Sequence, residues 1–145
     1  MRTIKFRGKR IDGKGFAYGD FLTGCGYKKG RYFILPLLDY YPNDCCSLDG
    51  YEIIPDTVGQ FTGLTDKNGK EIYEGDILMY DGNGYKGHSL LVIFKHGTFG
   101  YIYCDCFHSF AGNSNLTFNP LNTDVSFEVI GNIHDNPELL KGGKE

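Results

Sequence analysis

Apolar and polar residues alternate along most of this chain with a period of two, a pattern typical of half-buried β-strands. The first example runs from Thr3 to Arg7, with Ile4 and Phe6 on one face and Lys5 on the other. The same alternation predicts strands at residues 16–23, 31–38, 51–54, 76–80, 89–95, 98–104 and 126–133. We therefore predict a mainly β fold with little helix, built from many short strands.

The strongest turn signal is Asn68-Gly69, which lies between two further predicted strands. A two-residue loop would set Lys67 against Lys70, and like charges oppose strand pairing. A three-residue loop, Lys67-Asn68-Gly69, instead sets Asp66 against Lys70 and needs Gly69 in a left-handed conformation. We predict the three-residue loop and interpret Asp66, Asn68, Gly69 and Lys70 as structural hairpin residues.

The clearest helix signal lies near the end of the chain. Asn136 is a suitable capping residue, Pro137 suits the first helical position, and Glu138 to Lys141 completes about one turn. The chain has 21 glycines in 145 residues, about twice the average share, which argues against long helices. An α+β fold is the alternative.

The most plausible domain boundary lies near Pro55. We expect a basic β lobe at residues 1–55 and a second lobe at 56–145, whose strands resemble an SH3-like barrel. A single domain over residues 1–145 is the alternative, since the length suits one domain.

The composition, with 41% hydrophobic residues, indicates a globular protein. No apolar run approaches the roughly 18 residues of a membrane span, and the start of the chain alternates instead of forming an apolar signal segment. We expect a cytoplasmic protein with no membrane partner.

Five cysteines, an odd number, do not suit a disulfide framework, so free thiols are expected. Cys104, Cys106 and His108, joined by Cys45 or Cys46, are candidate metal ligands. Residues two apart on a strand lie roughly 6–7 Å apart, however, whereas two thiolates on one zinc ion must lie closer together. We therefore expect structural cysteines, no bound metal and no cofactor.

No catalytic motif has the context it needs. Gly82 to Gly87 matches a dinucleotide-binding string, but the residues that follow alternate as a strand, so no helix faces a phosphate. The four histidines show no spacing typical of catalysis. We expect no enzymatic activity, and we assign no catalytic residue.

Charge is distributed unevenly along the sequence. Residues 1–31 hold nine basic and two acidic residues, a net charge of +7, while the rest of the chain carries −10. Aromatic residues lie between the basic ones, as in surfaces that bind single-stranded DNA by stacking and phosphate contacts. The candidate interaction surface comprises Lys5, Arg7, Lys9, Arg10, Lys28, Lys29 and Arg31.

Three motifs, in order, resemble the YopX family, which occurs in phages, prophages and the gut bacteria that carry them. They are Ile4-Lys-Phe-Arg-Gly-Lys-Arg10, the run from Thr57 through the hairpin to Ile77, and Val129 to Leu140. Residues 25–47 and 105–122 show no resemblance. The family's activity is unknown, so the resemblance implies no catalytic residues.

Two functions remain. The first is a non-catalytic assembly or adaptor protein that acts as a homo-oligomer, or that binds a phage or host protein, because lobes of opposite charge suit contacts between identical subunits. The alternative is a module that binds single-stranded DNA through the basic N-terminal lobe. The overall charge of −3 favours self-association.

Overall fold

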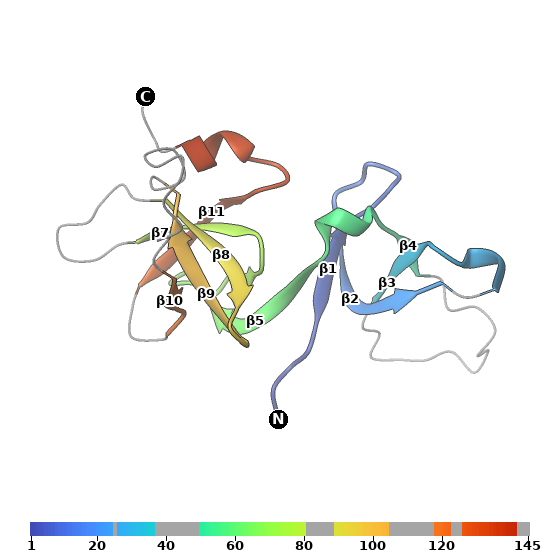
Figure 1. The fold of residues 1–145 in the computed structure, drawn as a ribbon, viewed down its shortest axis with the longest axis horizontal. Helices are drawn as coiled ribbons and strands as arrows, with labels where there is room; N and C mark the ends of the chain where they lie inside the picture. Colours follow the sequence, from blue (N-terminus) through green and yellow to red (C-terminus); the bar gives the residue numbers. More distant parts are fainter. Residues whose placement is uncertain (25, 37–49, 81–88, 105–117, 123–125, 142–145) are drawn as a thin grey trace. The chain divides into compact units, whose positions relative to one another are not determined.

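The computed structural model describes residues 1–24, 26–36, 50–80, 89–104, 118–122 and 126–141 (Figure 1). Strands dominate these residues, and the helical segments among them are short 3-10 turns, so the predicted mainly β fold is confirmed. The strands are β1 (Phe6–Lys9), β2 (Phe16–Thr23), β3 (Tyr32–Pro36), β4 (Tyr51–Glu52), β5 (Gly59–Thr65), β6 (Glu71–Tyr73), β7 (Asp76–Tyr80), β8 (Ser89–Lys95), β9 (Thr98–Tyr103), β10 (Asn119–Pro120) and β11 (Phe127–Asn132). The 3-10 turns are η1 (Gly26–Lys28), η2 (Pro55–Thr57) and η3 (Pro137–Lys141).

Residue contacts divide the chain into two compact units, Met1–Phe61 and Thr62–Glu145. The strands form two antiparallel sheets, in the orders β4-β3-β2-β1-β5-β6 and β10-β9-β8-β7-β11. Strand β5 crosses the unit boundary, since Gly59 and Gln60 pair with β1 and its later residues pair with β6. The division into separate domains at 1–55 and 56–145 stays a prediction.

The resemblance of the second lobe to an SH3-like barrel, expected from the sequence, is not confirmed. In the part of the chain that the structure describes, each sheet is an open series of strands with two ends. The second sheet ends in β10 and β11, and β10 is a two-residue strand that contains Pro120. Alternation identifies individual strands but not their order, which is why the sequence suggested a barrel-like arrangement where the strands form an open sheet.

The first unit is built around hairpins of β1, β2 and β3, which lie side by side in Figure 1. One face of these strands packs on a core of Ala17, Ile34 and Ile53. Gly8 makes this packing possible, because a Cβ at that position would lie 2.5 Å from the Cδ1 atom of Ile53. A bridge between Arg10 and Ile53 ties the end of β1 to the residues after β4.

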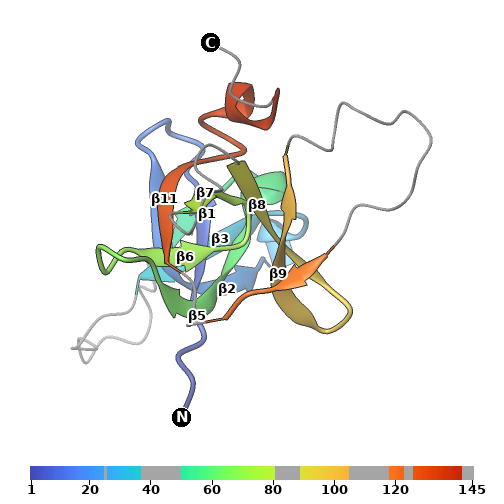
Figure 2. The same cartoon turned by 90° about the vertical axis from the view of Figure 1, so that its left-hand side faces the viewer.

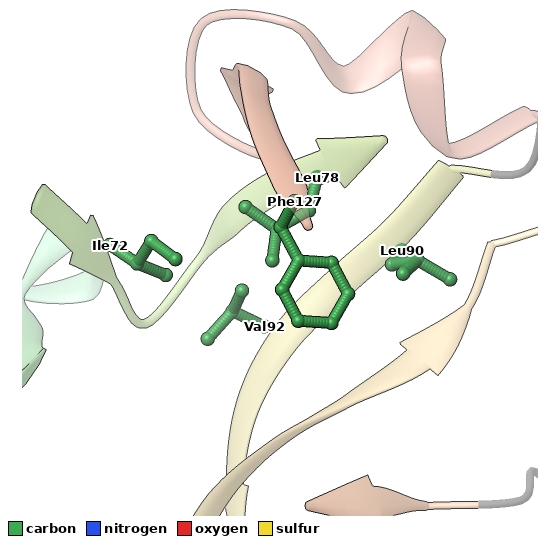
Figure 3. Packing of buried hydrophobic residues seen from close by; sticks show 5 residues of the cluster. All are labelled: Ile72, Leu78, Leu90, Val92 and Phe127. Carbon is green, nitrogen blue, oxygen red and sulfur yellow. The ribbon is translucent and has the colours of Figure 1, made fainter. Parts of the chain in front are cut away.

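The second unit has a core on each side of β7 and β8. Figure 3 shows one side, where Phe127 packs among the buried side chains of Ile72, Leu78, Leu90 and Val92. On the other side a second cluster contains Ile77, Leu91, Ile102 and Cys104, with Leu139 and Leu140 of η3 packed against it. Burial on both faces explains why the Ser89–Lys95 strand is apolar at consecutive positions.

The predicted three-residue hairpin loop is confirmed. The N–H of Asp66 donates to the carbonyl of Lys70 at 2.7 Å, and the N–H of Gly69 donates to the carbonyl of Asp66 at 3.0 Å. Gly69 has a φ of +80°, the left-handed conformation that this loop requires. The pairing of opposite charges at Asp66 and Lys70 therefore predicted this loop correctly.

The short helical segment near the end of the chain is also confirmed, as the 3-10 turn η3. The carbonyl of Asn136 accepts the N–H of Leu139, which begins the turn. The side-chain oxygen of Asn136 accepts the N–H of Asn132, so the side chain binds the end of β11. Gly131 leaves room for this contact, since a Cβ there would lie 2.5 Å from that oxygen.

Three strands have the bounds predicted from alternation, namely 16–23, 76–80 and 89–95. Strand β1 lies at residues 6–9 instead of 3–7, because its hairpin with β2 pairs Phe6 with Gly19 and Lys9 with Phe16. Strand β10 was not predicted, since Asn119 and Pro120 lack strand propensity. No helix among the described residues has the length and apolar character needed to cross a membrane.

We expect Gly69→Val to lower the free energy of unfolding by about 1–2 kcal/mol, because a β-branched residue is strained at positive φ. A Cβ at this position would have no heavy atom within 4 Å, so the conformation alone causes the cost. The measurement is the urea midpoint of each variant. Gly69→Asn is the matched control and should lose much less stability, since asparagine tolerates the left-handed region. Equal losses in both variants would contradict this explanation.

Candidate functional site

The hairpin residues make contacts beyond their own loop. The Oδ1 atom of the buried Asp66 accepts the N–H groups of Asn68 and Lys70, at 2.8 and 2.9 Å. Its Oδ2 atom accepts the N–H of Val129 on β11 at 3.0 Å, and the N–H of Lys67 donates to the carbonyl of Phe127. Figure 2 shows β11 beside the β5–β6 hairpin. Asp66 therefore holds the loop to a strand that lies 63 residues further along the chain.

The environment of Asp66 favours its charged form. Burial raises the pKa of this carboxyl, but the N–H groups of Val129, Lys70 and Asn68 together outweigh burial, and the charge of Lys70 adds to their effect. The pKa of Asp66 consequently lies below its ordinary value. This residue is structural, and we assign it no role in binding.

The predicted basic surface contains cations that lie over aromatic rings. On the β1–β3 sheet, cross-strand neighbours share a face, so Arg7 and Lys9 project with Tyr18 and Phe16 away from the core. We call this side the outer face. The cation–ring pairs are Lys5 over Phe61 at 5.4 Å, Arg7 and Lys9 over Phe16 at 4.7 and 5.9 Å, and Lys28 and Arg31 over Phe33 at 5.2 and 5.5 Å.

Arg31 also forms a two-point ion pair. Its Nε atom donates to Oε1 of Glu52 at 2.8 Å, and its Nη2 atom donates to Oε2 of the same residue. Hydrogen bonding by Arg31 lowers the pKa of Glu52, with burial acting in the opposite direction and the charges of Arg31 and Lys28 adding to the lowering. A planar, bidentate pair of this kind fixes both side chains in one geometry.

The structure brings some of the predicted basic residues together and separates others. Arg7 and Lys9 of β1 share the ring of Phe16, Lys5 lies just before β1 over Phe61, and Lys28 and Arg31 meet at Phe33. Arg10 is apart from both groups, because it pairs with Asp12 and lies 4.0 Å from the ring centre of Tyr51. Lys29 is exposed in the turn after η1, and Arg7 is buried, with 5% of its surface exposed. The seven residues therefore do not form one continuous basic patch.

The charge asymmetry is smaller when it is counted by structural unit. Residues 1–61 hold nine basic and seven acidic residues, a net charge of +2, and residues 62–145 hold six basic and eleven acidic ones, a net charge of −5. The acidic residues that follow position 31, Glu52 among them, offset most of the basic opening. A surface with balanced charges suits a protein partner better than a polyanion.

The candidate metal ligands cannot be assembled from the described residues. Cys104 is buried in the core of the second unit. Cys106, His108, Cys45 and Cys46 lie outside the residues that the structure describes, as does the Gly82–Gly87 string. Within the described ranges, no three His, Cys, Asp or Glu residues gather in a way that could hold a metal ion.

Sequence reasoning missed three residues that define the outer face beside Arg31. Glu52 lies 21 positions from its partner, and Ile11 and Ile54 flank it with 58% and 44% of their surfaces exposed. The sequence contains no local signal for this group, because the three positions meet only through the pairing of residues 9–11 with residues 52–54.

Comparison with known proteins identifies a family and similar solved structures. The model of a family described as "YopX protein" matches residues 34–141, a range that includes the hairpin and the last motif but begins after the opening motif. The crystal structure of protein EF1440 from Enterococcus faecalis is similar, with a TM-score of 0.51 and 26% sequence identity over 97% of this chain and 99% of that one. No curated protein matches the chain. Neither match names a reaction or a ligand.

We expect Asp66→Asn to lower the free energy of unfolding at pH 7 by on the order of 2 kcal/mol, because the N–H donors lose a charged acceptor. The folded-state pKa lies below the unfolded value of about 3.9, so this contribution is complete above that pH and is lost as pH falls through the folded pKa. Urea unfolding between neutral pH and about pH 3 measures it, and the difference from the wild type should shrink with falling pH. The exposed Asp56→Asn is the control. A difference that stays constant with pH would contradict the assignment.

Proposed function

The chain belongs to the YopX family, and we propose that it is a non-catalytic assembly or adaptor protein that acts as a homo-oligomer in the cytoplasm. The partner is a second copy of the chain, and a phage or host protein is the alternative protein partner. The proposal makes the first unit the assembly surface.

The observation that carries the proposal is the distribution of exposed apolar side chains. Eight large hydrophobic residues are exposed in the described part of the chain, and seven of them belong to the first unit. They are Met1, Ile4, Ile11, Tyr18, Leu22, Tyr51 and Ile54, and the eighth is Phe94. Such a concentration on one unit is typical of a surface that binds protein, because single exposed apolar residues are otherwise scattered.

The charged residues of the first unit support a structural use of its surface. Arg10 and Arg31 pair with carboxylates of the same unit, Asp12 and Glu52. A phosphate backbone would have to compete with these carboxylates for the two guanidinium groups.

Binding of single-stranded DNA is the second candidate, and the cations over aromatic rings favour it. Lys5, Lys9 and Lys28 lie within 6 Å of the centres of Phe61, Phe16 and Phe33. Alternating rings and cations are what a sequence-tolerant DNA surface presents. The net charge of the unit, only +2, makes this the weaker candidate.

We expect light scattering to give a mass of at least twice 16.3 kDa at low and at high salt, because ions do not screen apolar contacts and screen a buried ion pair much less than an exposed one. Leu22→Ser should shift the protein toward the monomer, since Leu22 is 41% exposed on the outer face. Phe94→Ser is the matched control, because Phe94 is 53% exposed in the second unit and should leave the mass unchanged.

A fluorescence assay with single-stranded DNA at the same salt concentrations completes the test. A monomer at every salt concentration that binds DNA with a steep salt dependence would replace the proposed function with the DNA-binding one. A monomer that binds no DNA would overturn both candidates and leave a protein that acts through another partner.

A further inference from the structure

A row of four residues crosses the outer face of the first unit. Leu22 on β2 pairs with Phe33 on β3, and Phe33 pairs with Glu52 on β4. The N–H of Ile11 donates to the carbonyl of Glu52 at 3.1 Å, which places Ile11 opposite Glu52. Because cross-strand partners project on the same side of a sheet, these side chains form one continuous row.

Exposed aliphatic side chains surround a fixed ion pair in this row. Leu22 and Ile11, at its ends, are 41% and 58% exposed, and Ile54, two residues after Glu52, is 44% exposed. The Arg31 side chain is 46% exposed and Glu52 is 22% exposed, while the Arg31 guanidinium also covers Phe33. An arginine held over an aromatic ring and ringed by apolar residues has the composition of a binding hot spot. We call Ile11, Leu22, Arg31, Phe33, Glu52 and Ile54 the Arg31–Glu52 patch.

The charges of the patch identify its occupant. Arg31 and Glu52 lie next to each other at its centre, Lys28 lies over the same Phe33 ring at 5.2 Å, and the exposed apolar residues lie on neighbouring positions of the sheet. A two-fold axis that passes between Arg31 and Glu52 would set each Arg31 opposite the other copy's Glu52 and would set the aliphatic ends of the row, Leu22 and Ile11, against each other. Such a surface is complementary to itself, as an isologous interface requires.

We infer that the Arg31–Glu52 patch is the contact surface of a two-fold homodimer, in which each Arg31 bridges Glu52 of its own chain and Glu52 of the second copy. This inference depends on the proposed homo-oligomer and specifies its symmetry and its residues. It departs from a head-to-tail contact between the two units, which would place the patch against the acidic second unit.

Charge reversal distinguishes the two geometries. Arg31→Glu places two carboxylates at the centre of the patch and Glu52→Arg places two guanidinium groups there, so the central charges of each variant repel those of its own copy across the two-fold axis. We expect each single variant to weaken self-association on the order of 100-fold by analytical ultracentrifugation, because like charges face each other in the interface. An equimolar mixture of the two variants should restore the dimer, since an acidic patch then faces a basic one.

Two controls separate the interface from folding. The double variant R31E/E52R keeps both charges in exchanged places and should dimerise like the wild type. The second unit offers a matched surface ion pair, Lys67 to Glu128 at 3.4 Å, and Lys67→Glu should leave self-association unchanged. Circular dichroism of each single variant verifies that the chain remains folded, and an unfolded variant would not be rescued by mixing.

The outcomes identify which idea fails. If the wild type is a monomer, the proposed function is wrong. If the wild type is an oligomer that neither single charge reversal weakens, the oligomer stands and the patch is not its interface. If the single variants dissociate and their mixture does not reassociate, the contact is not two-fold, and the inference is overturned in favour of a head-to-tail arrangement.

Discussion

The Asp66 carboxylate is the interaction on which the second unit depends. It accepts N–H groups from both arms of its own loop and from Val129 on β11, so one side chain defines the loop and attaches it to a distant strand. A buried carboxylate is costly unless its acceptor sites are filled, and three N–H donors fill them here. The hairpin loop and β11 are therefore held together.

The consequences of that attachment continue to the end of the described chain. β11 pairs with β7 and ends at Asn132. The side-chain oxygen of Asn132 accepts the N–H groups of His134 and Asp135. The resulting turn leads to η3, which covers the core beside Ile77 with Leu139 and Leu140. The last motif shared with the YopX family, from Val129 to Leu140, thus has a structural explanation for most of its polar residues.

The first unit is rich in basic and aromatic residues, and many of them contact each other. Arg10 and Arg31 pair with carboxylates of the same unit, and this pairing lowers the availability of their charge to an outside phosphate. The surface that remains for a partner is aliphatic and centred on an ion pair. For this reason we favour a protein partner for this unit over single-stranded DNA, although the first residues of the sequence are basic.

The sequence by itself determined the features that depend on residues close together in the chain, namely the positions of strands and the type of hairpin loop. Alternation located the strands at 16–23, 76–80 and 89–95, and the charges at Asp66 and Lys70 selected the hairpin loop, because a turn's chemistry lies within a few residues. Contacts between distant positions were decided only by the tertiary structure. Arg31 meets Glu52 across 21 positions and Asp66 meets Val129 across 63, and the strands form open sheets, because strand order and register depend on the packing of the whole core.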